Sequence, residues 1–352
     1  MSFIRYYALL WVLICCGAAV SCRNADNTQM GENNYFKVSN SAAVTKLFLA
    51  DRGGNTATVT RNADQTWTVN GKYLARQEAI DLLLETLREM RVRFSVTANT
   101  RPLVFRELAS SGIKVEVYEG SNKIRACYVG GGTPDQEGTY MIKEGEDIPY
   151  VTHIANWTGI LTPRFLTLVD DWRDRAMLRV SPDDLAEISV EYPAQRAASF
   201  RLTNKNGVYA VQPFYVSTTP LDKPVVQAAA KAYMLGLENL QAETFCNHHP
   251  KYDSIVGRVP FATITTRNTK NQLHTITLFP IAPRELGNPN DGNGGNGIVE
   301  QYFVWSDKTD LMLGQHRLLR NALWGYPSFF SELTPSQIKT PSKQSTDPKR
   351  YK

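Results

Sequence analysis

The chain has 352 residues, of which 42% are hydrophobic and 21% charged, a composition that indicates a globular protein with room for two domains. Its formal net charge is +5. Residues 335–352 carry five basic side chains and one acidic side chain, so the rest of the chain is nearly neutral and gives no support for nucleic-acid binding.

The N-terminal residues have the layout of a secretory signal peptide. Arg5 precedes an apolar run that is short for a membrane span, which needs about 20 apolar residues. The run ends in Ala19-Val20-Ser21-Cys22, which resembles the bacterial lipobox, where the cysteine is lipidated and becomes the first residue. Residues 1–21 are therefore predicted to be a signal peptide and Cys22 a lipidation site. The alternative is an uncleaved anchor helix.

The rest of the chain is predicted to form a tether, two folded halves and a tail. Residues 22–40 are polar and are expected to link the lipid to the body. Residues 41–178 and 179–334 share one order of predicted elements: strands, one helix, then strands again. Residues 335–352 have no apolar period and carry three prolines, which predicts a disordered basic tail.

In the first half, three segments with strand-like composition precede a helix: TKLFLADR, TATVTRN and TWTVNGKY. Apolar residues then recur on one helical face, at Ile80, Leu83, Leu84, Leu87 and Met90. Strands are predicted again at IKVEVYE, IRACYVG, GTYMIKE and PYVTHI.

The second half repeats this pattern. AEISVEY, ASFRLTN and VYAVQPF precede an apolar helical stripe from Val226 to Leu240, for which Asp222 and Pro224 provide start signals. Strands follow at FATITTR, HTITLFP, EQYFVWS and DLMLGQH. The predicted fold is therefore α+β, with two similar repeats that each contain a mainly antiparallel sheet and one main amphipathic helix.

The glycine-rich segment YVGGGTPDQEGTYM, Tyr128–Met141, could suggest a phosphate-binding loop. Such a loop needs a helix N-terminus behind it, so that backbone amides and the helix dipole meet the anion. Here a strand is predicted on both sides, and Gly-Lys-Ser/Thr does not follow. The segment is therefore predicted to be a hairpin connection that uses glycine for positive φ, and no cofactor site is expected.

Two clusters contain residue types that bind metals or catalyse reactions. Cys246, His248, His249 and Asp253 could ligate zinc, but their spacing fits no familiar site, so an exposed polar loop is favoured. Cys127 and Cys246 are interpreted as buried apolar residues rather than a disulfide framework.

The second cluster comprises Asp170, Asp171 and Asp174, which lie among Arg164, Arg173 and Arg175. This arrangement favours an ion-pair network over a catalytic acid–base pair.

A modification site is suggested separately. Asp253-Ser254-Ile255 resembles the short periplasmic O-glycosylation motif of Bacteroidetes, which makes Ser254 a candidate acceptor.

Five stretches together resemble a family of bacterial envelope proteins with a domain of unknown function. They are WTVNGKY from Trp67, GIKVEVY from Gly112, YVGG from Tyr128, GTYM from Gly138 and WRDR from Trp172. The resemblance covers mainly residues 44–214. It implies lipoproteins of the Bacteroidetes type, related to domains found near gliding-type ABC transporter subunits. It implies no reaction and no catalytic residue.

The sequence favours a lipid-anchored envelope protein that acts as a binding or scaffold subunit in an envelope protein complex. The residue after Cys22 is Arg23 rather than aspartate, which argues by analogy for the outer membrane, facing the periplasm. Two alternatives remain open: a periplasmic hydrolase or glycan-processing enzyme, and a surface glycan-binding protein. None of the five histidines stands in a recognisable catalytic motif, so a binding role is preferred to an enzyme.

Overall fold

The computed structural model describes residues 34–179, 181, 183–281 and 299–331. The predicted signal peptide, the lipidation site Cys22 and the C-terminal tail lie outside the described residues. The chain divides into two compact units, unit 1 ending at Asp174 and unit 2 beginning at Arg175. No helix among the described residues is long and apolar enough to cross a membrane.

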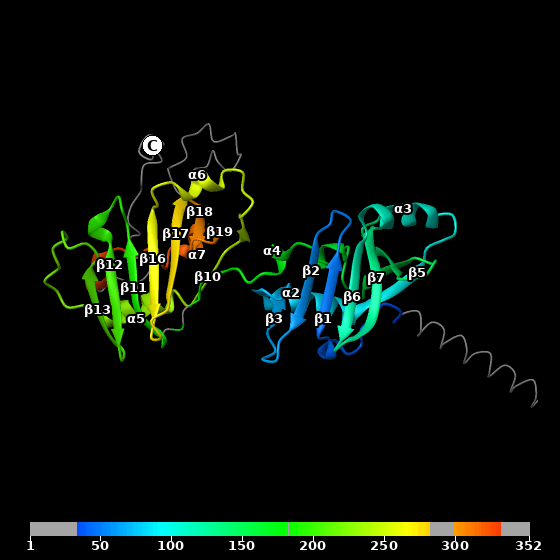
Figure 1. Cartoon of the computed structure of the whole chain (residues 1–352), viewed down its shortest axis with the longest axis horizontal. Helices are drawn as coiled ribbons and strands as arrows, with labels where there is room; N and C mark the ends of the chain where they lie inside the picture. The colour runs from blue at the N-terminus through cyan, green and yellow to red at the C-terminus, as the bar shows by residue number, and fades with distance from the viewer. Residues whose placement is uncertain (1–33, 180, 182, 282–298, 332–352) are drawn as a thin grey trace, which may run out of the picture. The chain divides into compact units, whose positions relative to one another are not determined.

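Unit 1 contains a nine-stranded antiparallel sheet in the order β4-β3-β2-β1-β6-β7-β8-β9-β5 (Figure 1). Its elements are η1 (Ser41–Ala43), β1 (Lys46–Ala50), β2 (Thr56–Arg61), β3 (Trp67–Val69), β4 (Tyr73–Leu74), α2 (Gln77–Glu89), β5 (Met90–Ser95), α3 (Arg101–Ser111), β6 (Ile113–Glu119), β7 (Asn122–Gly132), β8 (Thr139–Lys143), β9 (Tyr150–Ile154), η2 (Thr162–Arg164) and α4 (Val169–Trp172).

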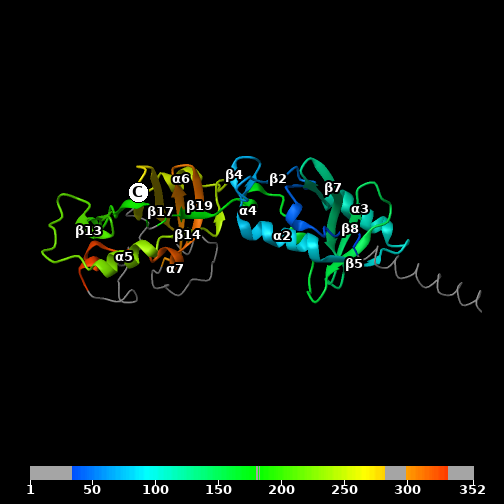
Figure 2. The same ribbon diagram turned by 90° about the horizontal axis from the view of Figure 1, so that it is seen from below.

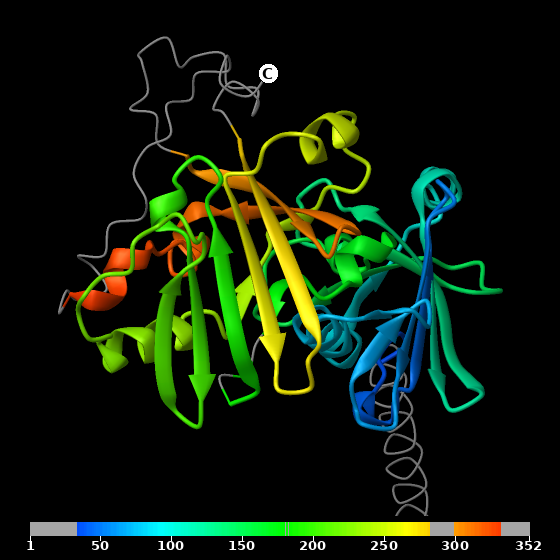
Figure 3. The same ribbon diagram turned by 60° about the vertical axis from the view of Figure 1, so that its left-hand side comes forward.

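Unit 2 contains an eight-stranded antiparallel sheet in the order β13-β12-β11-β16-β17-β18-β19-β15, and β10 pairs separately with β14 (Figure 3). Its elements are β10 (Ala176–Arg179), β11 (Leu185–Glu191), η3 (Arg196–Ala198), β12 (Phe200–Lys205), β13 (Val208–Pro213), α5 (Gln227–Leu235), β14 (Asn239–Gln241), β15 (Thr244–Phe245), α6 (Tyr252–Val256), β16 (Ala262–Asn268), β17 (Leu273–Pro280), β18 (Gln301–Ser306), β19 (Asp310–Gln315), α7 (His316–Leu319) and η5 (Tyr326–Phe330). The α+β prediction is confirmed in both units.

The predicted helix of unit 1 forms and packs against one face of its sheet (Figure 2). Ile80, Leu83 and Leu87 of α2 are fully buried in the same cluster as Leu47 and Val117 of the sheet. Complete burial of one such side chain contributes about 1.5–3 kcal/mol, so this apolar stripe is a large part of what fixes α2 to the sheet. Met90, at the end of the predicted stripe, is instead the first residue of β5.

The predicted helix of unit 2 is shorter than its apolar stripe. The α5 helix begins at Gln227 rather than near Asp222, because the N–H of Val226 donates to the carbonyl of Phe329 and fixes an extended residue there. The helix ends at Leu235, and Leu240 lies in β14, paired with Leu178 of β10. Both boundaries of the prediction are therefore wrong, since contacts distant in sequence set them.

The folded part of unit 1 begins before residue 41, so the tether is shorter than the predicted range 22–40. Phe36 and Val38 are buried in the core of unit 1, and the N–H of Val38 donates to the carbonyl of Leu87. The ring of Tyr35 packs against Tyr150 and lies under the ammonium of Lys143, 3.3 Å from the ring centroid. Residues 35–38 therefore belong to the folded unit.

The glycine-rich segment is a hairpin connection between β7 and β8, as predicted, but its glycines have a different reason. Gly130–Gly132 end strand β7, and positive φ falls on Gln136 instead. A Cβ at Gly138 would lie 2.3 Å from Cγ1 of Val151, and one at Gly132 would lie 2.4 Å from Cγ2 of Ile160. Close packing, and not positive φ, requires glycine here.

Gly138→Ala is expected to lower the free energy of unfolding by about 1–3 kcal/mol, because the added methyl group overlaps the buried Val151. Gly53→Ala is the matched control, since its Cβ would meet only an exposed turn at 3.3 Å and should change stability by less than about 0.5 kcal/mol. Urea denaturation of both variants measures this. Equal stability of the two variants would contradict the packing explanation.

Candidate functional site

The aspartate cluster of unit 1 is brought together for a structural purpose. Asp170 forms an ion pair with the buried Arg173 at 3.0 Å, and the Arg173 guanidinium lies 3.9 Å from the centroid of the Tyr73 ring. The N–H of Asp174 donates to the carbonyl of Leu74, and Arg76 Nε donates to the carbonyl of Asp171. These contacts fix the end of unit 1 to the β4 edge.

The neighbouring arginines extend in other directions. Arg164 donates to Thr86 Oγ1 at 3.1 Å, and its guanidinium lies over the Trp157 ring. Arg175, the first residue of unit 2, donates from Nη1 to the carbonyl of Glu243 in the same unit at 2.6 Å. The predicted ion-pair network includes the pair formed by Asp170 and Arg173.

The four candidate zinc ligands lie partly in a loop and partly in α6: His248 and Asp253 are exposed, Cys246 and His249 are half-buried, and Asp253 belongs to the helix. The His249 ring contacts Phe303 edge-on at 5.1 Å, and Asn247 Nδ2 donates to Asp310. Within the described ranges, no group of three or more His, Cys, Asp or Glu residues could hold a metal ion. Cys127 is buried and Cys246 half-buried, and both are free thiols. Burial raises the pKa of the Cys127 thiol to about 12, which keeps it in its unreactive form.

The described residues include one of the two predicted modification sites, Ser254, and not the other, Cys22. Ser254 lies exposed on the short helix α6, where its hydroxyl is accessible to solvent. Cys22 lies outside the described residues.

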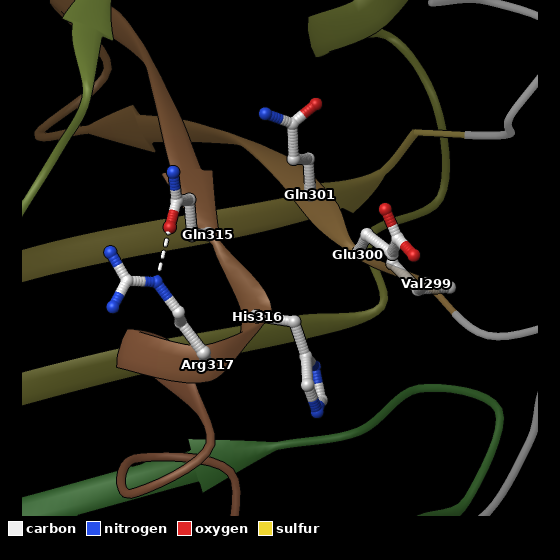
Figure 4. Close-up of a pocket in the computed structure, with 6 residues that line it drawn as sticks. All are labelled: Val299, Glu300, Gln301, Gln315, His316 and Arg317. Atoms are coloured by element: carbon white, nitrogen blue, oxygen red, sulfur yellow. Dashed lines mark hydrogen bonds between the residues drawn. The ribbon is translucent and has the colours of Figure 1, made fainter.

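A cavity of about 470 Å³ lies at the ends of β18 and β19 and the start of α7, as Figure 4 shows. We call it the His316 cavity. It is lined by Val299, Glu300, Gln301, Gln315, His316 and Arg317.

The antiparallel register of β18 and β19 creates this cavity. It sets Gln301 directly opposite Gln315, and the N–H of His316 donates to the carbonyl of Glu300. Residues from two strands and a helix start are thereby held at fixed positions relative to one another.

A chain of side-chain hydrogen bonds runs beside the cavity. Glu243 Oε2 accepts from Gln301 Nε2 at 3.3 Å and from Gln315 Nε2 at 3.2 Å. Gln315 Oε1 accepts from Arg317 Nε at 2.6 Å, and Arg317 extends into solvent. Each glutamine amide is oriented by its partner, so the order of donors and acceptors along this surface is fixed.

His316 is kept neutral near pH 7 by its surroundings. Burial lowers the pKa of its imidazole below the ordinary 6.5, and the charge of Arg320 lowers it further. Its ring stacks on Tyr302, whose hydroxyl lies 3.3 Å from His316 Nδ1. Burial raises the pKa of Tyr302, so the phenol keeps its proton and can donate it to Nδ1. In the tautomer in which Nδ1 accepts this hydrogen bond, Nε2 carries the N–H of the ring.

The lining side chains do not converge on one reacting position. In Figure 4 the His316 imidazole points away from Gln315 and Arg317, and the Glu300 carboxylate points in another direction. In general acid–base catalysis each group must lie within hydrogen-bonding reach of the proton that it transfers. The cavity instead offers separate donors and acceptors over an extended surface, which suits recognition of a polar chain.

The sequence analysis did not single out this site. It predicted both strands, and the pairing of EQYFVWS with DLMLGQH could have placed the two glutamines opposite each other. Glu243 lies 58 positions from Gln301 and 72 from Gln315, and no local pattern relates them.

The fold and the cavity define an α+β protein with two sheet-containing units and a surface site. A family model described as "Domain of unknown function (DUF4340)" matches residues 66–254, which is more than half of the chain, so the protein belongs to this family. The predicted resemblance to a family of unknown function is thereby confirmed. Neither the curated proteins nor the solved structures contain a match. The matched range ends before the His316 cavity.

The His316 imidazole is expected to titrate below pH 6.5, because burial disfavours its charged form. Arg320→Met should raise the midpoint only in part, since burial is the larger cause. Arg317→Met should leave it unchanged. NMR titration of the ring proton measures all three proteins. A midpoint above 6.5 in the unmodified protein would contradict the burial of His316.

The same shift has a consequence for stability. The unfolded chain binds this proton more readily than the folded one, so the free energy of unfolding should fall as the pH drops through about 6.5. His316→Gln should lose less stability over that interval.

Proposed function

We propose that the protein is a lipid-anchored subunit of the bacterial envelope that binds a partner protein of an envelope complex. The lipid on Cys22 would hold it at the outer membrane, with the body in the periplasm. The apolar run ending in Ala19-Val20-Ser21-Cys22 and the basic residue Arg23 after it support this location. The polar side chains of the His316 cavity support the binding role.

The observation that carries the binding role is the chain Glu243–Gln315–Arg317. Its amides are held by side-chain hydrogen bonds rather than by regular secondary structure, and Arg317 and His316 offer two separate donor groups that point in different directions from this surface. A partner segment with carboxylate and carbonyl groups would meet both donors. Donors that are already held in place lose less side-chain entropy when a partner binds, so less of the binding free energy is spent on ordering them.

We further propose that the two units are copies of one ancestral repeat. Without β4, the first sheet has the order β3-β2-β1-β6-β7-β8-β9-β5, and the second has β13-β12-β11-β16-β17-β18-β19-β15. Strands that take the same place in the two sheet orders also take the same place in the order along the chain. With β4 left out, α2 follows the third strand of the first sheet and α5 follows the third strand of the second. This agreement supports duplication. An experimental structure in which the two sheets cannot be superposed in this order would reject it.

The anchor is tested by Cys22→Ala. Several acyl chains, at about 0.8 kcal/mol per buried methylene, would hold the protein firmly on a membrane. We expect the variant to leave the membrane fraction or to stay unprocessed, and mass spectrometry of the unmodified protein to find an acylated N-terminal cysteine. An unmodified Cys22 peptide from native membranes would overturn the location.

The binding role is tested by photo-crosslinking in intact envelopes. A benzophenone amino acid at position 317 should give one defined adduct, whereas the same probe at the exposed Lys270 should give none. Gln301→Ala with Gln315→Ala should reduce the adduct about tenfold or more, since two oriented hydrogen-bonding groups are lost. The double variant must retain its melting temperature.

An adduct that forms equally at position 270, or that is indifferent to the double variant, would count against the His316 cavity as the binding surface. It would leave the anchor at Cys22 untouched, because that is measured separately.

A further inference from the structure

Strand β13 is the last strand on one side of the second sheet. Its register with β12 pairs Tyr209 with Asn204, Val211 with Leu202, and places Pro213 at the end. In an antiparallel edge strand, alternate residues direct both their N–H and C=O groups away from the sheet. Such groups form a template for another strand.

The side chain of Gln227 shows which residues face outward. Its Oε1 accepts from the N–H of Tyr209 at 2.9 Å, and its Nε2 donates to the carbonyl of Tyr209 at 2.9 Å. The amide thus makes the two bonds that a neighbouring strand would make. Because outward residues alternate, Val211 and Pro213 face the same side, and proline has no N–H to donate.

Unit 1 carries a strand at the corresponding position. There β4 pairs with the third strand, β3, and Ala75 continues this edge by bridging to Arg173. The N–H of Arg76 also donates to the carbonyl of Trp172. In the described part of unit 2, the sheet order ends at β13 with no strand in that place.

A cavity of about 490 Å³ lies beside β13, bordered by the segment 215–225 and by η5. Tyr326 and Phe330 form an edge-to-face pair at 5.0 Å, and the Tyr326 hydroxyl accepts from the N–H of Leu221 at 3.2 Å, which holds the cavity wall. The side chain of Val216 is fully exposed at its rim. We call this the β13 groove. It is lined by Val211, Gln212, Pro213, Tyr215, Val216, Thr218, Pro220, Leu221, Lys223, Val225, Tyr326 and Phe330.

We infer that the β13 groove binds an extended segment of a partner protein as an added strand beside Val211, with apolar side chains against Tyr215 and Phe330. The described lining holds one charged side chain, Lys223, so the segment should carry an acidic residue. Strand addition takes affinity from main-chain bonds and specificity from alternate side-chain pockets. The site is separate from the His316 cavity and does not depend on it.

Charge favours an external partner over other occupants. Residues 335–352 of the chain carry five basic side chains against Asp347 alone, so they share the sign of Lys223. A second copy joined edge to edge about a twofold axis would bring two Lys223 side chains toward one interface. An acidic, apolar segment from another protein would be attracted to Lys223 instead of being repelled by it, as the basic tail or a second copy would be.

The probe is a phage-displayed library of random nine-residue peptides, selected on the full-length chain. Enriched peptides are then synthesised, and their affinity is measured by fluorescence anisotropy. We expect acidic, alternately apolar peptides. N-methylation should weaken binding about three- to tenfold per site at alternate residues only, because each lost main-chain hydrogen bond removes a modest share of the affinity.

Two variants separate strand addition from general apolar binding. Gln227→Ala should tighten binding about threefold or more, since it uncovers the N–H and C=O of Tyr209 and lengthens the ladder. Lys223→Glu should weaken binding of the acidic peptides about tenfold.

Three results would overturn the proposal. The first is a library that yields no groove-dependent peptide, or peptides insensitive to N-methylation. The second is binding that appears only after residues 332–352 are removed, which would make the tail the occupant. The third is a dimer in sedimentation that Tyr215→Ala dissociates, which would make a second copy the occupant.

Discussion

Both units depend on one constraint: adjacent residues of a strand face opposite sides of the sheet, so each sheet has a large core cluster on one face and a smaller one on the other. In β17, Leu278 belongs to the main core under α5, and the next residue, Phe279, packs with Ile255 of α6 on the opposite face. In unit 1, Val104 of α3 covers the opposite face only near β7 to β9 and β5. The remaining parts of these faces stay polar.

The polar parts are filled by paired charges. In unit 1, Lys114 contacts Glu116 at 3.0 Å and Glu144 at 2.9 Å, and Lys123 contacts the same two carboxylates. Hydrogen bonds from Lys114 and Lys123 lower the pKa of Glu144, so the cluster is charged at neutral pH. Because its charges satisfy each other, this surface has little to offer a ligand, whereas the β13 groove and the His316 cavity retain groups directed outward.

Most strands of the two sheets were predictable because strand alternation is a local property, and the sheet partners within hairpins follow from short turns. The strands β5, β10, β14 and β15 were not predicted. Nor were the helix boundaries. The α3 helix was missed because Leu103 and Phe105 are exposed, so its apolar residues do not form one stripe. The start of α5 is set by Phe329, more than a hundred residues after Val226. The chemistry of the His316 cavity was equally hidden, since Glu243 reaches both glutamines only after the sheet has formed.

The two candidate surfaces differ in what they share with the family. The matched range, residues 66–254, contains β13 and Gln227, but it ends before Val299. The first unit has β4 next to β3, and Ala75 beyond β4 bridges to Arg173. In unit 2 the edge strand is β13, and the side-chain amide of Gln227 makes two of the hydrogen bonds that a neighbouring strand would make.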